Sequence, residues 1–387
     1  MTTTNMQLPP LSLYVHIPWC VQKCPYCDFN SHAQPEIIPE AQYIACLLDD
    51  LAADLRYVQG RKLTSIFIGG GTPSLFSAAG IQGLLQGIEA LIPFNPNIEI
   101  TLEANPGTFE TERFAGFADA GVTRLSIGVQ SLQQQQLQRL GRIHNSEQAQ
   151  IAAQHASTLA LTSFNLDLMH GLPEQTLATA MADLEGIIAL NPPHISWYQL
   201  TIEPNTMFAS KPPVLPNDDV LWDIYEQGHI RLAAAGYEQY EVSAYGKPRH
   251  RGQHNLNYWR FGDYLGIGCG AHGKITLPDQ QQIIRTEKVK HPRGYLDLTR
   301  NFVFKQWQVE PDERVFEYFM NRLRLLEPVP KSEFSAFTGL PLDKADKALA
   351  DSIRKGFIEN TAEHWQTTAT GRLYLNQVLS DLLTEDN

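Results

Sequence analysis

Three cysteines near the N-terminus are spaced closely enough to bind one metal centre. Cys20, Cys24 and Cys27 follow the pattern C-x3-C-x2-C, so a single loop presents three thiolates. A [4Fe–4S] cluster normally takes four cysteine ligands, and with three of them one iron keeps an open position for another ligand. The same residue types also allow a zinc site of three cysteines and one histidine, with His16 or His32 as the fourth ligand.

Glycine-rich or polar residues follow the other predicted strands. Residues 69–73 read Gly-Gly-Gly-Thr-Pro, a turn whose backbone N–H groups a ligand can approach. Glu103, Gln130 and Asp167 each end a different predicted strand. Any one of them alone could equally be a helix cap or a solvated strand end. Because the carboxyl ends of parallel strands meet at one edge of a sheet, we expect all of these residues to line one cavity with the cysteines.

These residues must be positioned by an alternation of short β-type runs and amphipathic segments that extends from Leu11 to about Gly246. This alternation is typical of a parallel sheet with crossover helices. Six such units are fewer than the eight of a closed barrel, so an open doubly wound sheet and an incomplete barrel both fit. The predicted strands are 11–17, 64–69, 98–103, 124–129, 163–169 and 195–202. The predicted helices are 39–57, 77–91, 110–120, 133–140 with 146–159, and 176–190.

The C-terminal part of the chain does not continue this regular alternation. We expect a helix at about 218–235, a strand at 237–244 and an ordered loop over 247–273. Helical patterns at 311–325, 331–337 and 342–355, then a hairpin near 356–373, predict a small, mainly helical domain of winged-helix type. The expected domains are a core at 1–246, a connecting segment at 247–300 and the C-terminal domain at 301–387.

Composition and net charge exclude several classes of protein. The chain has 387 residues, of which 43% are hydrophobic and 19% charged, as in a globular protein with a substantial core. Its net charge of −12 has the wrong sign for binding to phosphate backbones, so we expect no nucleic-acid partner. Neither a secretory signal nor a membrane-spanning segment is visible, and the 5 cysteines are too few and too clustered for a disulfide framework. We therefore expect a cytoplasmic protein.

The cysteine spacing, preceded by Tyr-Val-His-Ile-Pro at 14–18 and joined to the glycine turn, resembles the radical S-adenosylmethionine superfamily. The motifs are most similar to its oxygen-independent coproporphyrinogen III oxidase branch, and the resemblance covers nearly the whole chain. It implies an α/β fold with an incomplete (β/α)6 barrel, in which Cys20, Cys24 and Cys27 bind a [4Fe–4S] cluster. The positions that match the superfamily's S-adenosylmethionine site are Tyr14, Tyr26, Gly70, Gly71, Thr72, Glu103, Gln130, Arg142 and Asp167.

Three of these positions have side chains whose chemistry suits the role that the resemblance implies. Glu103 would accept hydrogen bonds from the ammonium group of S-adenosylmethionine, and Arg142 would pair with its carboxylate. Asp167 would bind the ribose hydroxyls. The amino and carboxylate groups of the same ligand would chelate the open iron.

Two features favour a haem chaperone over the oxidase. The oxidases of this branch carry a further cysteine two residues after the third ligand, where this chain has Phe29. Residues 254–259, His-Asn-Leu-Asn-Tyr-Trp, match the H-N-x-x-Y-W signature of the HemW-type haem chaperones, which the oxidases are not expected to have. The candidate haem-binding residues are therefore His254, Asn255, Tyr258 and Trp259.

An imidazole can ligate haem iron, and the two aromatic rings can lie against a porphyrin face. Lys247, Arg249 and Arg251 are near the motif in sequence and could pair with the propionates, while His272 is a second candidate ligand. The alternative is that His254 and its aromatic neighbours only pack the open side of the barrel.

The sequence thus predicts a protein that binds haem and transfers it to haem-requiring apoproteins, including membrane-associated respiratory proteins. The cluster and S-adenosylmethionine would then have a regulatory or structural role. The alternative is an enzyme of haem biosynthesis that oxidatively decarboxylates coproporphyrinogen III through a radical. A zinc-dependent or structural module is the third hypothesis, and the sequence leaves open whether the chain forms a homodimer.

Overall fold

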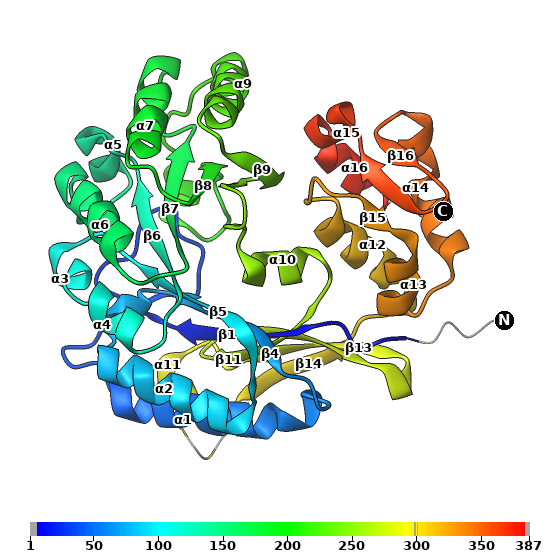
Figure 1. The fold of residues 1–387 in the computed structure, drawn as a ribbon, viewed down its shortest axis with the longest axis horizontal. Helices are drawn as coiled ribbons and strands as arrows, with labels where there is room; N and C mark the ends of the chain where they lie inside the picture. The colour runs from blue at the N-terminus through cyan, green and yellow to red at the C-terminus, as the bar shows by residue number, and fades with distance from the viewer. Residues whose placement is uncertain (1–5, 298, 300, 384–387) are drawn as a thin grey trace.

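The computed structural model describes residues 6–297, 299 and 301–383. Its largest element is a 12-stranded mixed sheet in the order β14-β13-β12-β11-β1-β4-β5-β6-β7-β8-β10-β9 (Figure 1). Neighbouring strands from β1 to β8 in this order are parallel. These strands are β1 (Leu11–Ile17), β4 (Leu63–Gly70), β5 (Phe94–Ala104), β6 (Arg124–Gln130), β7 (Ser163–His170) and β8 (His194–Gln199). The described strands form an open sheet, so the predicted incomplete (β/α)6 architecture is confirmed.

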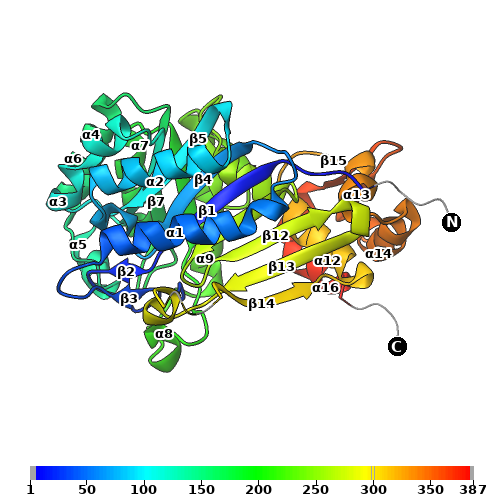
Figure 2. The same ribbon diagram turned by 90° about the horizontal axis from the view of Figure 1, so that it is seen from below.

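Helices cover one face of this sheet, and α1 and α2 lie side by side on its outer side (Figures 1 and 2). Local sequence explains where several of them begin. The side chain of Asn145 accepts from the backbone N–H of Gln148 in a capping box, and Ser77 caps its helix through Gly80 N–H. The crossover helices are α1 (Glu40–Asp54), α2 (Ala78–Leu91), α3 (Thr108–Thr111), α4 (Phe114–Asp119), α5 (Gln134–Arg139), α6 (Ser146–Thr158) and α7 (Leu177–Ala189).

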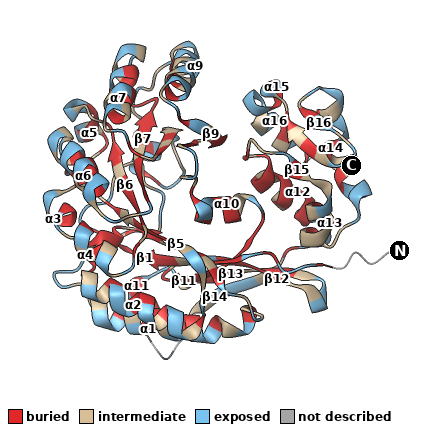
Figure 3. Cartoon of the chain, viewed as in Figure 1, coloured by how far each residue is buried: buried red, intermediate tan, exposed pale blue. Residues whose placement is uncertain are grey.

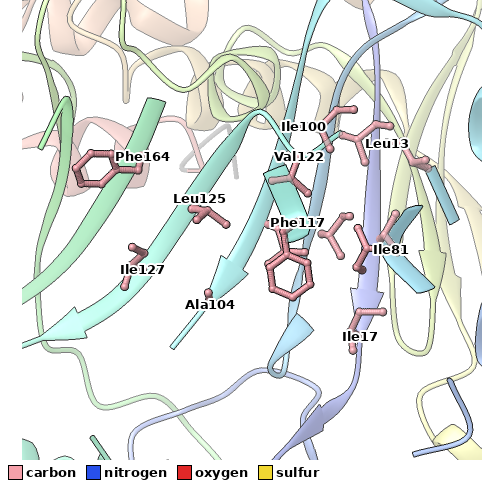
Figure 4. Close-up of a cluster of buried hydrophobic side chains, with 14 of the residues drawn as sticks. Leu13, Ile17, Ile81, Ile100, Ala104, Phe117, Val122, Leu125, Ile127 and Phe164 are labelled. Carbon is pink, nitrogen blue, oxygen red and sulfur yellow. The ribbon is translucent and has the colours of Figure 1, made fainter. Parts of the chain in front are cut away.

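Each central strand presents an apolar face to these helices and a more polar face to the barrel interior. In β7, Phe164, Leu166 and Leu168 belong to the hydrophobic core, whereas Asn165 donates a hydrogen bond to Asp167. This follows from the alternation of side chains along a strand. Figure 4 shows part of the apolar layer, and the central strands β6 and β7 are mostly buried in Figure 3. The barrel interior can therefore contain the polar side chains of a binding site.

The interpretation of residues 247–273 as loop is wrong. They contain α10 (Gln253–Trp259), β11 (Asp263–Gly268) and the first two residues of β12 (His272–Leu277). β11 pairs in parallel with β1, and β12, β13 (Gln282–Lys288) and β14 (Val303–Gln308) extend the sheet antiparallel beyond it. The high glycine content hid β11, although glycine is needed there because a side chain at Gly266 would collide with the backbone of β12.

At the other edge of the sheet, the elements agree more closely with those predicted from the sequence. The expected helix near 218–235 is α9 (Asp218–Ala234). The single strand expected at 237–244 is instead two antiparallel strands, β9 (Glu238–Glu241) and β10 (Ala244–Gly246). A tight turn separates them, and β10 pairs antiparallel with β8.

The small helical region expected at the C-terminus is confirmed. Its hydrophobic core around Trp365, Phe319 and Phe334 is distinct from that of the central strands but also includes residues from the edge of the sheet, such as Ile283. Helix, short strand, two helices and hairpin follow one another, which is the element order of a winged helix. The elements are α12 (Pro311–Arg322), β15 (Val329–Pro330), α13 (Lys331–Thr338), α14 (Leu342–Arg354), β16 (Ile358–Asn360), β17 (His364–Thr367), α15 (Ala369–Leu373) and α16 (Leu375–Asp381). Within the described part of the chain, no helix combines the length and the apolar character needed to cross a bilayer.

Candidate functional site

A cavity of about 470 Å³ lies at the carboxyl ends of the central strands. Its volume is in the range of ~300–1,000 Å³ that is usual for small-molecule sites. It brings together almost all residues predicted for the cluster and for S-adenosylmethionine. Those that line it are Cys20, Cys24, Cys27, Tyr26, Gly70, Gly71, Thr72, Glu103, Gln130, Arg142 and Asp167.

Tyr14 is the exception, because it does not line this cavity. Its side chain points into the barrel from the middle of β1, below the carboxyl edge of the sheet. Its hydroxyl group lies 2.9 Å from His16 Nδ1, and its ring stacks on Phe67 with 6.3 Å between centroids. The charge of Glu103, which does line the cavity, acts on the Tyr14 hydroxyl group, so the contact between Tyr14 and S-adenosylmethionine stays a prediction.

The cysteine loop is held at its base by a short parallel pair of strands, β2 (Trp19–Cys20) and β3 (His32–Ala33). A turn in which Cys27 N–H donates to the Cys24 carbonyl at 3.2 Å places both side chains at the cavity wall. Burial raises the pKa of the Cys20 and Cys27 thiols. Thiolates at these positions therefore need a cationic partner, which a bound metal centre provides.

The histidines that a zinc site would need are already occupied. His16 Nε2 lies 2.8 Å from the Asn30 carbonyl, and its other ring nitrogen contacts Tyr14. His32 Nε2 contacts Asn30 Oδ1 at 3.3 Å. Three thiols without a histidine fit a cluster with an open position better than they fit zinc.

The glycine turn brings backbone to the cavity edge. Gly70 has φ +111°, and a Cβ atom there would collide with the ring of His16. Its N–H donates to Glu103 Oε2 at 3.0 Å, and the N–H of Gly71 donates to the Ile17 carbonyl at 2.7 Å. Glycine is thus required by backbone conformation and close packing at this point.

Two buried carboxyl groups dominate the electrostatics of the cavity. Burial, and then the charge of Asp167, raises the pKa of Glu103 to about 8. Burial also raises the pKa of Asp167, although hydrogen bonds from Asn165 and Ser196 oppose it. Glu103 forms no ion pair with any residue in the described ranges. A cationic ligand that supplies the missing counter-charge would bind favourably beside these groups.

Arg142 lies against the cluster loop, following α5. Its Nη2 donates to Asn105 Oδ1 and to the Gly128 carbonyl, both at 2.7 Å, and its Nη1 is 3.7 Å from Cys24 Sγ. Asn105 in turn donates to Thr72 Oγ1 at 3.3 Å. The guanidinium group is therefore held in place at the cavity wall, where it can bind an anionic group of a ligand.

Sequence reasoning missed several residues of the cavity wall. The signal for two of them was present, since strand periodicity at β8 puts Ser196 and Tyr198 on the interior face. The hydroxyl group of Tyr198 donates to Gln130 Oε1 at 2.8 Å. The missed residues that line the cavity include Asn105, Met169, Ser196, Tyr198 and Gln199.

The motif at 254–259 forms α10, and its helical geometry separates the four haem candidates. His254 and Tyr258, four residues apart, face the barrel, whereas Asn255 is exposed and Trp259 faces the C-terminal region. The guanidinium carbon of Arg324 lies 4.4 Å from the centre of the Trp259 ring. The structure therefore does not bring these four side chains to one surface.

His254 itself is only 3% exposed. Its Nδ1 lies 3.1 Å from Ser65 Oγ, and its Nε2 has no hydrogen-bond partner among the described residues. Burial lowers the pKa of His254 to about 3, so the imidazole is neutral at physiological pH. When Nδ1 donates to Ser65, Nε2 presents a free lone pair, but a haem iron can reach it only if α10 or the surrounding rings move.

The basic residues expected to pair with propionates lie elsewhere. Lys247 donates to the side chain of Asn191, and Arg251 forms an ion pair with Glu238 at 3.2 Å. Arg249, with φ +71°, belongs to the same turn after β10. His272 is exposed at the start of β12, opposite Glu287. None of these side chains is placed next to His254, because the turn leaves the sheet before α10 begins.

Comparison with protein families gives two matches. Residues 14–185 match the radical SAM superfamily, and residues 309–374 match the HemN C-terminal domain. The chain is 58% identical over 380 residues to a protein of Escherichia coli strain K12 named heme chaperone HemW, covering 98% of this chain and 100% of that protein. It is 59% identical over 384 residues to the protein of the same name from Haemophilus influenzae, covering 98% of this chain and 100% of that one.

The fold also resembles a solved structure. Coproporphyrinogen III oxidase HemN from Escherichia coli, described as a radical SAM enzyme, superposes with a TM-score of 0.81 and 23% sequence identity. The alignment covers 98% of this chain and 91% of that one. At this identity the likeness concerns the fold alone.

Proposed function

Because the chain belongs to the HemW family within the radical SAM superfamily, we propose that it is a haem chaperone, which binds haem and passes it to haem-requiring apoproteins. The observation that carries this proposal is identity of 58% and 59%, over nearly the full length, to proteins named heme chaperones. The acceptors that we propose are respiratory apoproteins reached from the cytoplasm.

The cavity at the strand ends is the proposed site of the other two cofactors. Cys20, Cys24 and Cys27 would hold a [4Fe–4S] cluster, and S-adenosylmethionine would bind between Glu103 and Arg142. The buried carboxyl groups suit its ammonium and sulfonium charges, and the guanidinium group suits its carboxylate. When bound, the cluster would supply an electron for reductive chemistry on S-adenosylmethionine.

Phe29 argues against the oxidase alternative. Its side chain is 56% exposed and lines the cavity, at the position where the oxidases of this branch are expected to carry a further cysteine. A phenyl ring can supply neither a thiol ligand nor a hydrogen-atom donor. We therefore expect no conversion of coproporphyrinogen III to protoporphyrinogen IX by the protein with an intact cluster, under anaerobic conditions with S-adenosylmethionine.

The test of the chaperone function is a haem titration of the anaerobically reconstituted protein, followed in the Soret region. Saturable binding near one haem per chain, and its transfer to an apoprotein that binds haem, is the expected result. His254 is the proposed iron ligand, so His254→Ala should shift the Soret maximum, whereas the conservative surface change Ile230→Ala should not. Absence of saturable binding by the wild type would overturn the proposal.

A further inference from the structure

A second hollow lies outside the barrel, where the edge of the sheet meets the C-terminal region. It has a volume of about 610 Å³, and its walls come from α9, β9 and the segment 369–375. A cavity of about 370 Å³ adjoins it and is lined by Trp259 of the motif helix α10. We call the two together the junction groove. The residues that line both parts are Val242, Arg324, Arg372, Leu373 and Leu375.

One wall of the junction groove is aromatic and unusually exposed. Trp222 is 48% exposed, and its ring stacks on that of Tyr225 with 5.7 Å between centroids and 26° between planes. Val242 and Leu373, 39% and 49% exposed, continue the apolar surface towards Trp259. Contiguous exposed apolar surface of this kind marks a binding site more often than chance.

The groove also carries positive charge in a chain whose net charge is −12. Arg324 lies over the Trp259 ring and 3.3 Å from Glu241, while Arg372 forms no ion pair with any residue that the structure describes. Asp218 is the acidic residue among those lining the groove. An apolar aromatic wall with two guanidinium groups suits a flat ligand that has an anionic edge.

We propose that the junction groove binds the porphyrin of haem, with the macrocycle against Trp222 and Val242 and the propionates at Arg324 and Arg372. The proposal rests on the proposed haem-chaperone function. It assigns haem to the junction groove, a surface that the motif at 254–259 alone does not indicate. It accounts for the orientation of Trp259, which faces the groove while His254 faces the barrel.

Binding in the groove does not require iron, since it uses the porphyrin face and its carboxylates. Gln199 lines both the groove and the cavity at the strand ends, so the porphyrin would lie next to the proposed S-adenosylmethionine site. In this structure the groove is separate from the enclosed ring of His254, which the iron of a groove-bound haem reaches only if α10 or the surrounding rings move. Porphyrin binding in the groove can therefore be tested separately from iron ligation.

The experiment measures the affinity of the full chain for haem, for metal-free protoporphyrin IX and for haem dimethyl ester, using tryptophan fluorescence and absorbance. We expect Arg372→Glu to weaken binding of haem and of protoporphyrin IX by about tenfold or more, and binding of the ester much less. Trp222→Ala should weaken binding of all three ligands. His254→Ala should leave the affinity for metal-free protoporphyrin IX near that of the wild type.

Two matched controls accompany these variants. Arg354→Glu reverses an exposed charge in α14 of the same region, and Ile230→Ala removes an exposed apolar side chain from the same helix as Trp222. Both should bind like the wild type. If the wild type binds haem but Arg372→Glu and Trp222→Ala bind it equally well, the groove assignment is wrong and the chaperone function stands. If the wild type binds neither haem nor protoporphyrin IX, both proposals fail.

Discussion

At the scale of single residues, the cavity at the strand ends contains charged groups whose charges and hydrogen bonds are not fully matched without a ligand. Glu103 and Asp167 lie close together at the half-buried cavity wall, and the hydrogen bond from Gly70 N–H satisfies only one oxygen of Glu103. Arg142 is fixed by Asn105 and the Gly128 carbonyl beside Cys24. Such an arrangement costs stability in the free protein, and a zwitterionic ligand with an added positive charge offsets the cost.

The affinity for S-adenosylmethionine should therefore depend on the protonation of Glu103. Its pKa of about 8 means that the free protein carries a neutral Glu103 below this pH, and binding an ammonium group requires the carboxylate. The affinity should rise with pH towards 8, by roughly tenfold per pH unit at most, and then fall because the α-amino group of the ligand loses its proton above pH ~8. Calorimetric titrations of the reconstituted protein across this range would show it. In Glu103→Gln the affinity should be lower and this part of the pH dependence should disappear; an unchanged slope would contradict the assignment.

Gly70 offers a test of the turn that supports this site. Gly70→Ala places a Cβ atom against His16 at φ +111°, so we expect a loss of ~1–3 kcal/mol in the free energy of unfolding. Gly83→Ala is the matched control, because Gly83 lies in α2 with open space around it. There the exchange should be neutral or stabilising. Urea denaturation of both variants gives the comparison, and equal effects would refute the steric argument.

At the scale of elements, a chain of hydrogen bonds crosses the barrel interior from the cofactor cavity to the motif helix. Asn165 donates to Asp167 at 2.7 Å and lies 2.7 Å from His194, whose Nε2 is 2.8 Å from the Tyr240 hydroxyl group. That hydroxyl accepts from the N–H of Gly252, the residue before α10, at 3.1 Å. The strands β7, β8 and β9 thereby determine where α10 begins.

Tyr240→Phe should break this chain at its last link. The change leaves Gly252 N–H and His194 Nε2 without a buried partner, which costs ~1–3 kcal/mol in the free energy of unfolding. We also expect faster hydrogen exchange of the α10 amides. Tyr374→Phe removes a hydroxyl group from a 55% exposed side chain and should have little effect. Similar stability and exchange in the two variants would show that the Tyr240 hydroxyl does not support the helix.

At the scale of the whole molecule, the C-terminal region is tied to the sheet by a few ion pairs around a shared core. Arg260 donates to both oxygens of Glu327 at 2.8 and 2.7 Å, and Arg285 pairs with Glu317 at 2.6 Å. Met6 and Ile283 pack into the C-terminal core from the barrel side. These contacts hold the two walls of the junction groove in place.

The ion pair at Glu327 should make this attachment sensitive to acid. Burial raises the pKa of Glu327, but hydrogen bonds and charges from Arg260 and Arg322 outweigh it and lower the pKa below its usual value. The carboxylate thus stabilises the fold above pH ~4.3, and this contribution is lost as the pH falls through the lower pKa of the folded state. Because Glu327 and Arg260 are partly exposed, and the buried Arg322 keeps its ion pair with Glu333, Glu327→Gln should cost only about 1 kcal/mol at pH 7. The loss should shrink towards pH 3 in urea unfolding, whereas the exposed control Glu359→Gln should change little at any pH.

Local sequence patterns predicted most of the central elements of this fold. The six parallel strands and their helices, the small helical C-terminal region and the residues around the cysteine loop follow from periodicity, turn residues and motif spacing. The strand β11 was not predicted, because its short, glycine-rich sequence has a strand conformation only through pairing with β1, about 250 residues earlier in the chain. Ser196 and Tyr198 were predictable from the alternation in β8, but no motif drew attention to them.

The sequence by itself determined which functional groups are available to a binding site, since thiols, carboxyl groups and a guanidinium group are properties of residue types and their spacing. Only the tertiary structure decided which of these groups meet. It placed Tyr14 behind the residues that line the cavity, divided the motif between two faces of α10 and brought Trp222 of the barrel opposite Arg372 of the C-terminal region. The physical reason is that spacing along a chain encodes neighbours within one element, whereas a cavity wall is assembled by packing between elements that are far apart in sequence.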